Sequence, residues 1–314
     1  MTYVPKILFI LIFFTATGTI YDASSEDVSL PKASSLTVKW GVSARKGQRA
    51  TMEDSHAIAM FEGQAIYGIF DGHRGDAASS YAAAHLLPAI HEYGEEKSYV
   101  LIDKQIEALG ASGTTAVTAR IETLSNGSHQ LTIGWAGDSR AVLIKKDCSV
   151  RFATKGHRPE DQSERKRIEL AGGNVYLDRT EYVSRVASTI SEVNGLGVAR
   201  ALGDVDWVND HISPVPNIKV LTLKPNEDAF LILACDGVWD FMNDELAAFI
   251  VAETMRENPE MTVDEASEQD GYQTIEEGND LLSIMAARSI RDGAYVRESN
   301  DNISAMLLCF VWQK

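Results

Sequence analysis

The stretch Ala65-Ile-Tyr-Gly-Ile-Phe70-Asp71-Gly72 sets a pattern that recurs along the chain: an apolar run that meets an acid. Such a run, bounded by Asp and Gly, predicts a buried strand. The run Phe230–Cys235 ends in the same way at Asp236, and Asp301 precedes the run Ile303–Trp312. Because neighbouring strands lie about 4.8 Å apart, we expect these acids to converge at one end of a sheet.

Converging carboxylates repel one another and would take up protons unless a cation joined them. Carboxylate and carbonyl oxygens select Mg²⁺, Mn²⁺ or Ca²⁺ rather than Zn²⁺. A single Asp-Gly pair at a strand end is more often an ordinary turn. Three strand-end acids, together with Glu53-Asp54 and Asp138, favour a metal site.

The other apolar segments predict an α+β layered domain, because strands and helices are mixed without strict βαβ alternation. Leu131–Ala136 and Arg140–Ile144 are predicted strands, and the Gly137-Asp138-Ser139 segment between them predicts a hairpin turn. Apolar residues at helical spacing predict one helix over 78–90, and a second is expected after Asn243, a good N-cap residue.

Composition and motifs narrow the function. The chain has 314 residues, is 45% hydrophobic and carries a net charge of −16, which argues against nucleic acid as a partner. No cysteine stands six residues before an arginine, as a cysteine-nucleophile phosphatase would need, and P-loop, HExxH and GxSxG motifs are absent from the sequence. Water activated by a metal is the hydrolytic chemistry that remains.

The N-terminus predicts a secretory signal over residues 1–18, followed by a polar linker over 19–37. Lys6 precedes the eight apolar residues Ile7–Phe14, which are too few to span a bilayer, and small residues follow. The alternative is a buried strand or an apolar tail. With the signal, we expect entry into the secretory pathway, secretion or delivery to another cell or compartment, and no stable membrane insertion after cleavage. Without it, we expect a cytoplasmic or nuclear protein.

Seven motifs, in order from Trp40 to the C-terminus, resemble those of the metal-dependent serine/threonine protein phosphatases (PPM, type 2C). They are Arg49-Ala-Thr-Met-Glu53-Asp54, Phe70-Asp71-Gly72-His73-Arg-Gly75, Ser112-Gly-Thr-Thr-Ala116, Ala136-Gly137-Asp138-Ser139-Arg140, Ala199-Arg200-Ala-Leu-Gly203-Asp204, Ala234-Cys-Asp236-Gly237-Val-Trp-Asp240 and Asp301-Asn302-Ile-Ser304.

The resemblance implies two antiparallel β-sheets in a sandwich flanked by helix pairs, a four-layer αββα arrangement. It implies two core Mg²⁺ or Mn²⁺ ions and a weaker third position. Asp71 would bridge the two core ions, with Asp236 and Asp301 completing one of them. The implied roles of the other metal residues are these: the Gly72 carbonyl and Glu53 serve the second ion, Asp54 holds metal-bound water, and Asp138 joins Asp236 at the third position.

The implied reaction is hydrolysis of phosphoserine and phosphothreonine by a hydroxide that bridges the two ions, with no phosphoenzyme. Arg49 would grip phosphate oxygens and His73 would protonate the leaving oxygen. The alternatives are that His73 only orients Asp71 or a water, and that Arg49 forms a surface ion pair with Glu53 or Asp54.

The resemblance places the phosphatase domain at 38–314, with a flap at about 160–195 and an acidic insertion at about 258–280 that we expect to be an exposed loop. Gly156 stands where the family usually carries aspartate, and a local packing change is expected there. We expect a monomer that acts on phosphorylated proteins. The alternative is a secreted effector or pseudophosphatase scaffold that only binds; retention of Asp71, Asp236 and Asp301 favours the active enzyme.

Overall fold

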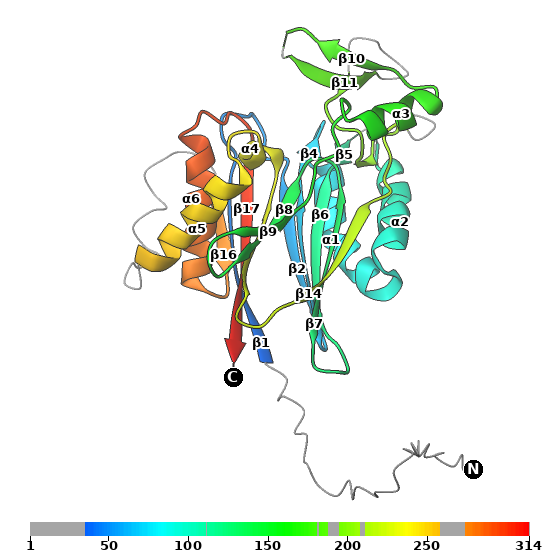
Figure 1. Cartoon of the computed structure of the whole chain (residues 1–314). Helices are drawn as coiled ribbons and strands as arrows, with labels where there is room; N and C mark the ends of the chain where they lie inside the picture. Colours follow the sequence, from blue (N-terminus) through cyan, green and yellow to red (C-terminus); the bar gives the residue numbers. More distant parts are fainter. Residues whose placement is uncertain are drawn as a thin grey trace, which may run out of the picture. The chain divides into compact units, whose positions relative to one another are not determined.

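The computed structural model describes residues 35–110, 112–180, 182–187, 195–207, 211–257 and 274–313. The predicted signal peptide therefore lies outside the described residues. Most strands fall into two antiparallel sheets (Figure 1). Sheet A has the order β16 (Thr274–Gly278), β1 (Ser35–Arg45), β17 (Ile303–Gln313), β15 (Asp228–Ala234), β8 (Arg140–Lys145) and β9 (Val150–Ala153). Sheet B has the order β14 (Asn217–Leu223), β7 (His129–Ala136), β6 (Ala116–Thr123), β3 (Gln64–Phe70) and β2 (Ser55–Phe61).

The central strands are apolar throughout because both of their faces are buried. In β3, Tyr67 and Ile69 pack into the core between the sheets, whereas Ile66 and Phe70 pack outward against helices. Strands β15 and β17 follow the same alternation. This burial on two faces explains why the sequence shows continuous apolar runs rather than alternating ones.

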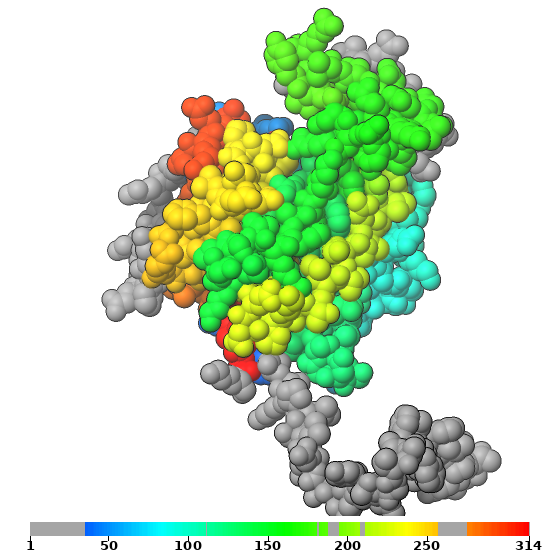
Figure 2. Space-filling model, in the orientation of Figure 1, coloured from blue at the N-terminus to red at the C-terminus, as the bar shows by residue number. Residues whose placement is uncertain are grey.

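Two helix pairs cover the outer faces of the sheets. The pair α1 (Ala77–Tyr93) and α2 (Glu95–Glu107) packs on sheet B, and the pair α5 (Asp244–Glu257) and α6 (Leu281–Tyr295) packs on sheet A. In the surface view of Figure 2 the two pairs, cyan and yellow-orange, lie on opposite sides. The predicted four-layer αββα arrangement is therefore confirmed. No helix in the described part of the chain is long and apolar enough to cross a membrane.

Short elements gather beyond the ends of the sheets. A small sheet joins β13 (Leu202–Gly203), β5 (Gly113–Thr114) and β4 (Gly72–His73). A second one, β10 (Val175–Asp178), β11 (Val183–Ala187) and β12 (Gly195–Leu196), lies in the predicted flap with α3 (Gln162–Leu170). The short helix α4 (Asp236–Trp239) follows β15 directly.

The predicted hairpin at Gly137–Ser139 is wrong. Strand β7 pairs with β6 and β14 in sheet B, whereas β8 pairs with β15 and β9 in sheet A. The segment therefore crosses from one sheet to the other. Gly137 has a φ of +110°, and a Cβ there would lie 2.5 Å from the Thr115 side chain, so this crossing needs glycine.

Two predicted boundaries also need correction. Strand β1 begins at Ser35, inside the predicted linker, because Leu36 packs against the core between the sheets. The acidic insertion is not a loop throughout, since Thr274–Gly278 forms edge strand β16 beside β1. There Glu276 pairs with Arg288 and Arg291 of α6. Residues 258–273 lie outside the described part of the chain.

Candidate active site

Three aspartates from both sheets meet at one end of the sandwich. Asp71 follows β3 of sheet B, Asp236 follows β15 of sheet A, and Asp138 lies on the crossing between β7 and β8. One carboxylate oxygen from each of the three lies within 4.8 Å of those of the other two. The sequence predicted that the strand-end acids Asp71, Asp236 and Asp301 would converge. The structure brings Asp71 and Asp236 together with Asp138, from two stacked sheets rather than one.

These carboxylates are held in an environment that disfavours their charge. Burial, followed by the charge of Asp236, raises the pKa of Asp71 well above its usual value. Burial, followed by the charge of Asp138, does the same to the pKa of Asp236. The pKa of Asp138 is also raised, chiefly by burial. Carboxylates that repel one another in this way need protons or cations, and divalent cations with oxygen ligands fit the donor set.

A cleft of about 300 Å³ opens at this point. Eight of the nine residues predicted for the site line it: Arg49, Glu53, Asp71, Gly72, His73, Asp138, Asp236 and Asp301. Asp301 lies outside the compact triplet of aspartates. Its Oδ2 accepts a hydrogen bond of 2.6 Å from Arg49, so the ion pair of Arg49 is formed with Asp301 rather than with Glu53 or Asp54.

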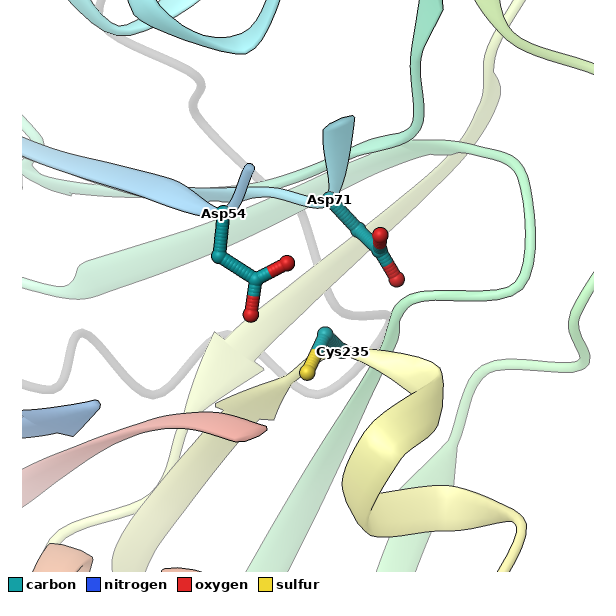
Figure 3. A group of neighbouring side chains, drawn as sticks. All are labelled: Asp54, Asp71 and Cys235. Atoms are coloured by element: carbon teal, nitrogen blue, oxygen red, sulfur yellow. The ribbon is translucent and has the colours of Figure 1, made fainter. Parts of the chain in front are cut away.

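Asp54, the ninth residue, lies behind the cleft. Its Oδ2 accepts a 2.6 Å hydrogen bond from the Ser304 hydroxyl, and its Oδ1 is buried without a partner in the described structure. Figure 3 shows the side chains of Asp54, Asp71 and Cys235 turned toward one another. Burial raises the pKa of Asp54 to about 6, although the bond from Ser304 opposes this shift. Cys235 is a buried free thiol.

Glu53 is fixed by hydrogen bonds, and its backbone lies directly against Gly72. The Glu53 N–H donates to Asn302 Oδ1 at 2.7 Å, and its Oε2 accepts from the Gly75 N–H at 3.1 Å. A Cβ on Gly72 would lie 2.3 Å from the Glu53 carbonyl oxygen. Glycine is therefore required at position 72 by the approach of the protein backbone itself.

His73 is positioned by the small sheet of β13, β5 and β4. Its Nε2 lies 2.8 and 2.9 Å from the two carboxylate oxygens of Asp204. Asp204 is buried and has a φ of +59°, directly after β13. Burial alone would lower the pKa of His73, but the charge of Asp204 and its hydrogen bond raise it above the usual value.

Sequence reasoning missed the roles of Asp204, Asn302 and Arg158, although two of them stood in quoted motifs. The Asn302 side chain also donates to the Lys46 and Thr51 carbonyls, at 2.8 and 3.0 Å, and so anchors the loop that carries Arg49. Arg158 contacts two acids of the cleft. Of the three, only Asn302 stands next to a predicted ligand, Asp301.

Comparison with known proteins agrees with this geometry. The family model described as "Protein phosphatase 2C" matches residues 38–303. The chain belongs to this family. It is a phosphoprotein phosphatase of the serine/threonine class by that membership, so the enzyme class predicted from the sequence is confirmed.

Individual members of the protein phosphatase 2C family are moderately similar. Human protein phosphatase 1A is 30% identical over 87% of this chain and 71% of its own length. The crystal structure of a phosphatase from a pathogenic strain of Toxoplasma gondii superposes with a TM-score of 0.70 at 24% identity, covering 89% of this chain and 100% of that one. A C. elegans sex-determining protein gives a TM-score of 0.68 at 24% identity over 89% of this chain, which spans only 65% of that protein. At this identity the solved structures show the shared fold.

Proposed function

We propose that the chain hydrolyses phosphoserine and phosphothreonine esters in proteins, with two divalent cations, Mg²⁺ or Mn²⁺, and without a phosphoenzyme. The observation that carries this proposal is the meeting of Asp71, Asp138 and Asp236 within 4.8 Å. The proposed ligands of these two ions are Asp71, Asp236, Asp301, Glu53 and the Gly72 carbonyl. When bound, such cations would lower the pKa of a coordinated water so that hydroxide attacks phosphorus in line.

Arg49 is suited to bind the phosphate group. Its side chain lies at the mouth of the cleft, 60% exposed, and Asp301 holds it from one side. A guanidinium has five N–H donors in a planar fork, and Asp301 engages one of its terminal nitrogens. Within the described part of the chain no other protein atom accepts a hydrogen bond from its remaining donors, and they suit binding of two phosphate oxygens and orientation of the phosphorus.

His73 is suited to protonate the leaving serine or threonine oxygen. Asp204 engages Nε2, which leaves Nδ1 as the ring nitrogen that delivers the proton. The raised pKa favours the protonated imidazole, the form that a general acid requires. Asp204 does not touch substrate in this scheme and acts as a positioning residue.

The competing function is a binding scaffold that has lost turnover. The retained acids and the cleft that they line favour an enzyme. Metal-dependent turnover distinguishes an enzyme from a scaffold. We expect Mn²⁺-dependent hydrolysis of para-nitrophenyl phosphate and of phosphoserine and phosphothreonine peptides, and its abolition by EDTA. Hydrolysis that persists in EDTA would refute the metal mechanism, and the absence of any turnover with Mn²⁺ or Mg²⁺ would favour the scaffold.

Asp236→Asn tests the site itself. A neutral amide is a poor metal ligand, and metal ions contribute several kcal/mol of transition-state stabilisation, so we expect kcat to fall by about 100-fold or more. Asp147→Asn is the matched control, because Asp147 is an exposed turn residue remote from the cleft. A nearly normal rate for Asp236→Asn would remove Asp236 from the site.

A further inference from the structure

The acids of the catalytic cleft differ in whether the protein already supplies them with a positive charge. Asp301 pairs with Arg49. Asp138 and Asp240 both pair with Arg158. By contrast, Asp71 and Asp236 form no ion pair with a basic side chain in the described part of the chain. The protein thus divides the cluster into an inner pair, Asp71 and Asp236, without a directly paired cation, and three outer acids, Asp138, Asp240 and Asp301, that each have one.

Arg158 is fixed between two of the outer acids. Its Nε lies 3.3 Å from Asp138 Oδ2, and a terminal nitrogen lies 2.5 Å from Asp240 Oδ1. The Arg158 side chain is 27% exposed and the Asp138 side chain is 4% exposed, so the first contact is largely shielded from water. A delocalised guanidinium is permanently charged and tolerates partial burial better than an ammonium, which suits it to a structural counter-ion.

The backbone at Gly156 lies close to Asp138, and it is the Arg158 side chain that contacts the Asp138 carboxylate. Gly156 lies directly against Asp138, since a Cβ there would be 3.0 Å from the Asp138 Cα. Glycine at position 156 offers no side-chain ligand, and a side chain there would require Asp138 to shift by a few tenths of an ångström. The guanidinium lies between Asp138 and Asp240, two acids that could otherwise attract a metal ion.

We propose that Arg158 is a built-in cation that occupies the outer part of the acidic cluster and limits this enzyme to two metal ions. This inference rests on the proposed function, because it assumes that Asp71 and Asp236 bind the two resident cations. It replaces the third metal position that the sequence predicted at Asp138. Arg158 acts through the acids that it holds and is therefore a positioning residue.

Counting bound Mn²⁺ in the folded full-length chain tests the proposal. By isothermal titration calorimetry and by the EPR signal of free Mn²⁺, we expect two ions in the wild type. Arg158→Gln frees Asp138 and Asp240 and should bind one additional ion. Arg158→Met, which is also neutral and packs well, should do the same, so that one poorly folding variant does not decide the result. Arg158→Lys keeps a positive charge and should bind two.

Two controls separate the counter-ion role from general disturbance of the fold. Arg140→Gln breaks an ion pair with Asp244 outside the cleft and should leave two ions bound. Asp240→Asn added to Arg158→Gln should remove the additional ion. Two ions in both neutral Arg158 variants, or three in the wild type, would overturn the proposal. No Mn²⁺ binding by the wild type would instead overturn the proposed function, so the two failures can be told apart.

Discussion

At the scale of single residues, the proposed proton transfer depends on the contact between His73 and Asp204. Asp204 is buried in a left-handed backbone conformation and reaches His73 Nε2 at 2.8 Å. Such a conformation is uncommon for a residue other than glycine. At Asp204 this conformation places the carboxylate against His73, the proposed general acid.

Replacement of Asp204 should slow hydrolysis most for substrates whose leaving group needs a proton. Asp204→Asn removes the charge that raises the pKa of His73. We expect kcat on a phosphoserine peptide to fall by about 100-fold, within the usual range for general-acid catalysis. Para-nitrophenyl phosphate should lose much less, because nitrophenolate leaves without a proton. The alkaline limb of the pH–rate profile should also move to lower pH, because His73 then loses its proton more easily.

Asp206→Asn is the control for this prediction, since Asp206 pairs with Arg74 and not with His73. An equal loss on both substrates by Asp204→Asn would contradict the role assigned to His73 and would indicate a general structural defect.

His157 should make stability depend on pH. Burial, followed by the charge of Arg200, lowers its pKa to about 4, from about 6.5 in the unfolded chain. Between pH 4 and pH 6.5, His157 binds a proton in the unfolded state but not in the folded state. Its contribution to the free energy of unfolding is therefore complete above pH 6.5 and is lost as the pH falls toward 4. The shift corresponds to about 3 kcal/mol. Urea unfolding across this window should show a smaller pH slope for His157→Gln than for the wild type; equal slopes would show that His157 is not buried in its neutral form.

At the scale of elements, α6 lies directly on two strands at a pair of glycines. Gly41 of β1 is opposite Gly278 of β16, and a Cβ on Gly41 would lie 2.1 Å from the Ile284 backbone nitrogen. Because the atom that an alanine side chain would meet belongs to the backbone of α6, the whole helix would have to move. We expect Gly41→Ala to lower the free energy of unfolding by about 2–3 kcal/mol, measured by urea denaturation.

Gly197→Ala is the matched substitution for this measurement. A Cβ on Gly197 would have Val183 Cγ1 as its nearest neighbour, at 3.8 Å, which is an ordinary contact. Its effect should stay within about 0.5 kcal/mol. An equally small effect of Gly41→Ala would show that α6 is not seated on β1 as described.

The elements also show what sequence reasoning can predict. Strands β3, β15 and β17 were predictable because burial on both faces makes each a continuous apolar run, and the acids at their ends were visible with them. The crossing at Gly137–Ser139 was mistaken for a hairpin because turn residues do not reveal which sheet the next strand joins. The two-residue strands around His73 carry no periodicity, and the roles of Asp204 and Arg158 arise only from tertiary contacts.

At the scale of the whole molecule, the N-terminal signal stays a prediction, because residues 1–18 lie outside the described part of the chain. If a cell that exports proteins makes the full chain with a C-terminal tag, we expect secreted protein whose N-terminus begins near residue 19. Leu11→Arg should interrupt the apolar run and retain the protein inside. Retention of the wild type with an intact N-terminus would place the enzyme in the cytoplasm or nucleus instead.

Charge repulsion acts between the two sheets, since Asp71 follows a strand of sheet B and Asp236 follows a strand of sheet A. Without cations, these half-buried carboxylates should destabilise the contact between the layers, as their raised pKa values indicate. With cations, the same carboxylates should tie the layers together, because a ligand that binds only the folded state stabilises it by mass action.

Thermal unfolding of the wild type and Asp236→Asn, each in EDTA and in saturating Mn²⁺, tests this claim most directly. Mn²⁺ at 100 times its Kd should raise the wild-type Tm by roughly 5–10 °C. We expect a crossover in stability: Asp236→Asn should be more stable than the wild type in EDTA, because repulsion is relieved, and less stable in Mn²⁺. A variant that is less stable in EDTA, with an undiminished rise in Mn²⁺, would contradict it.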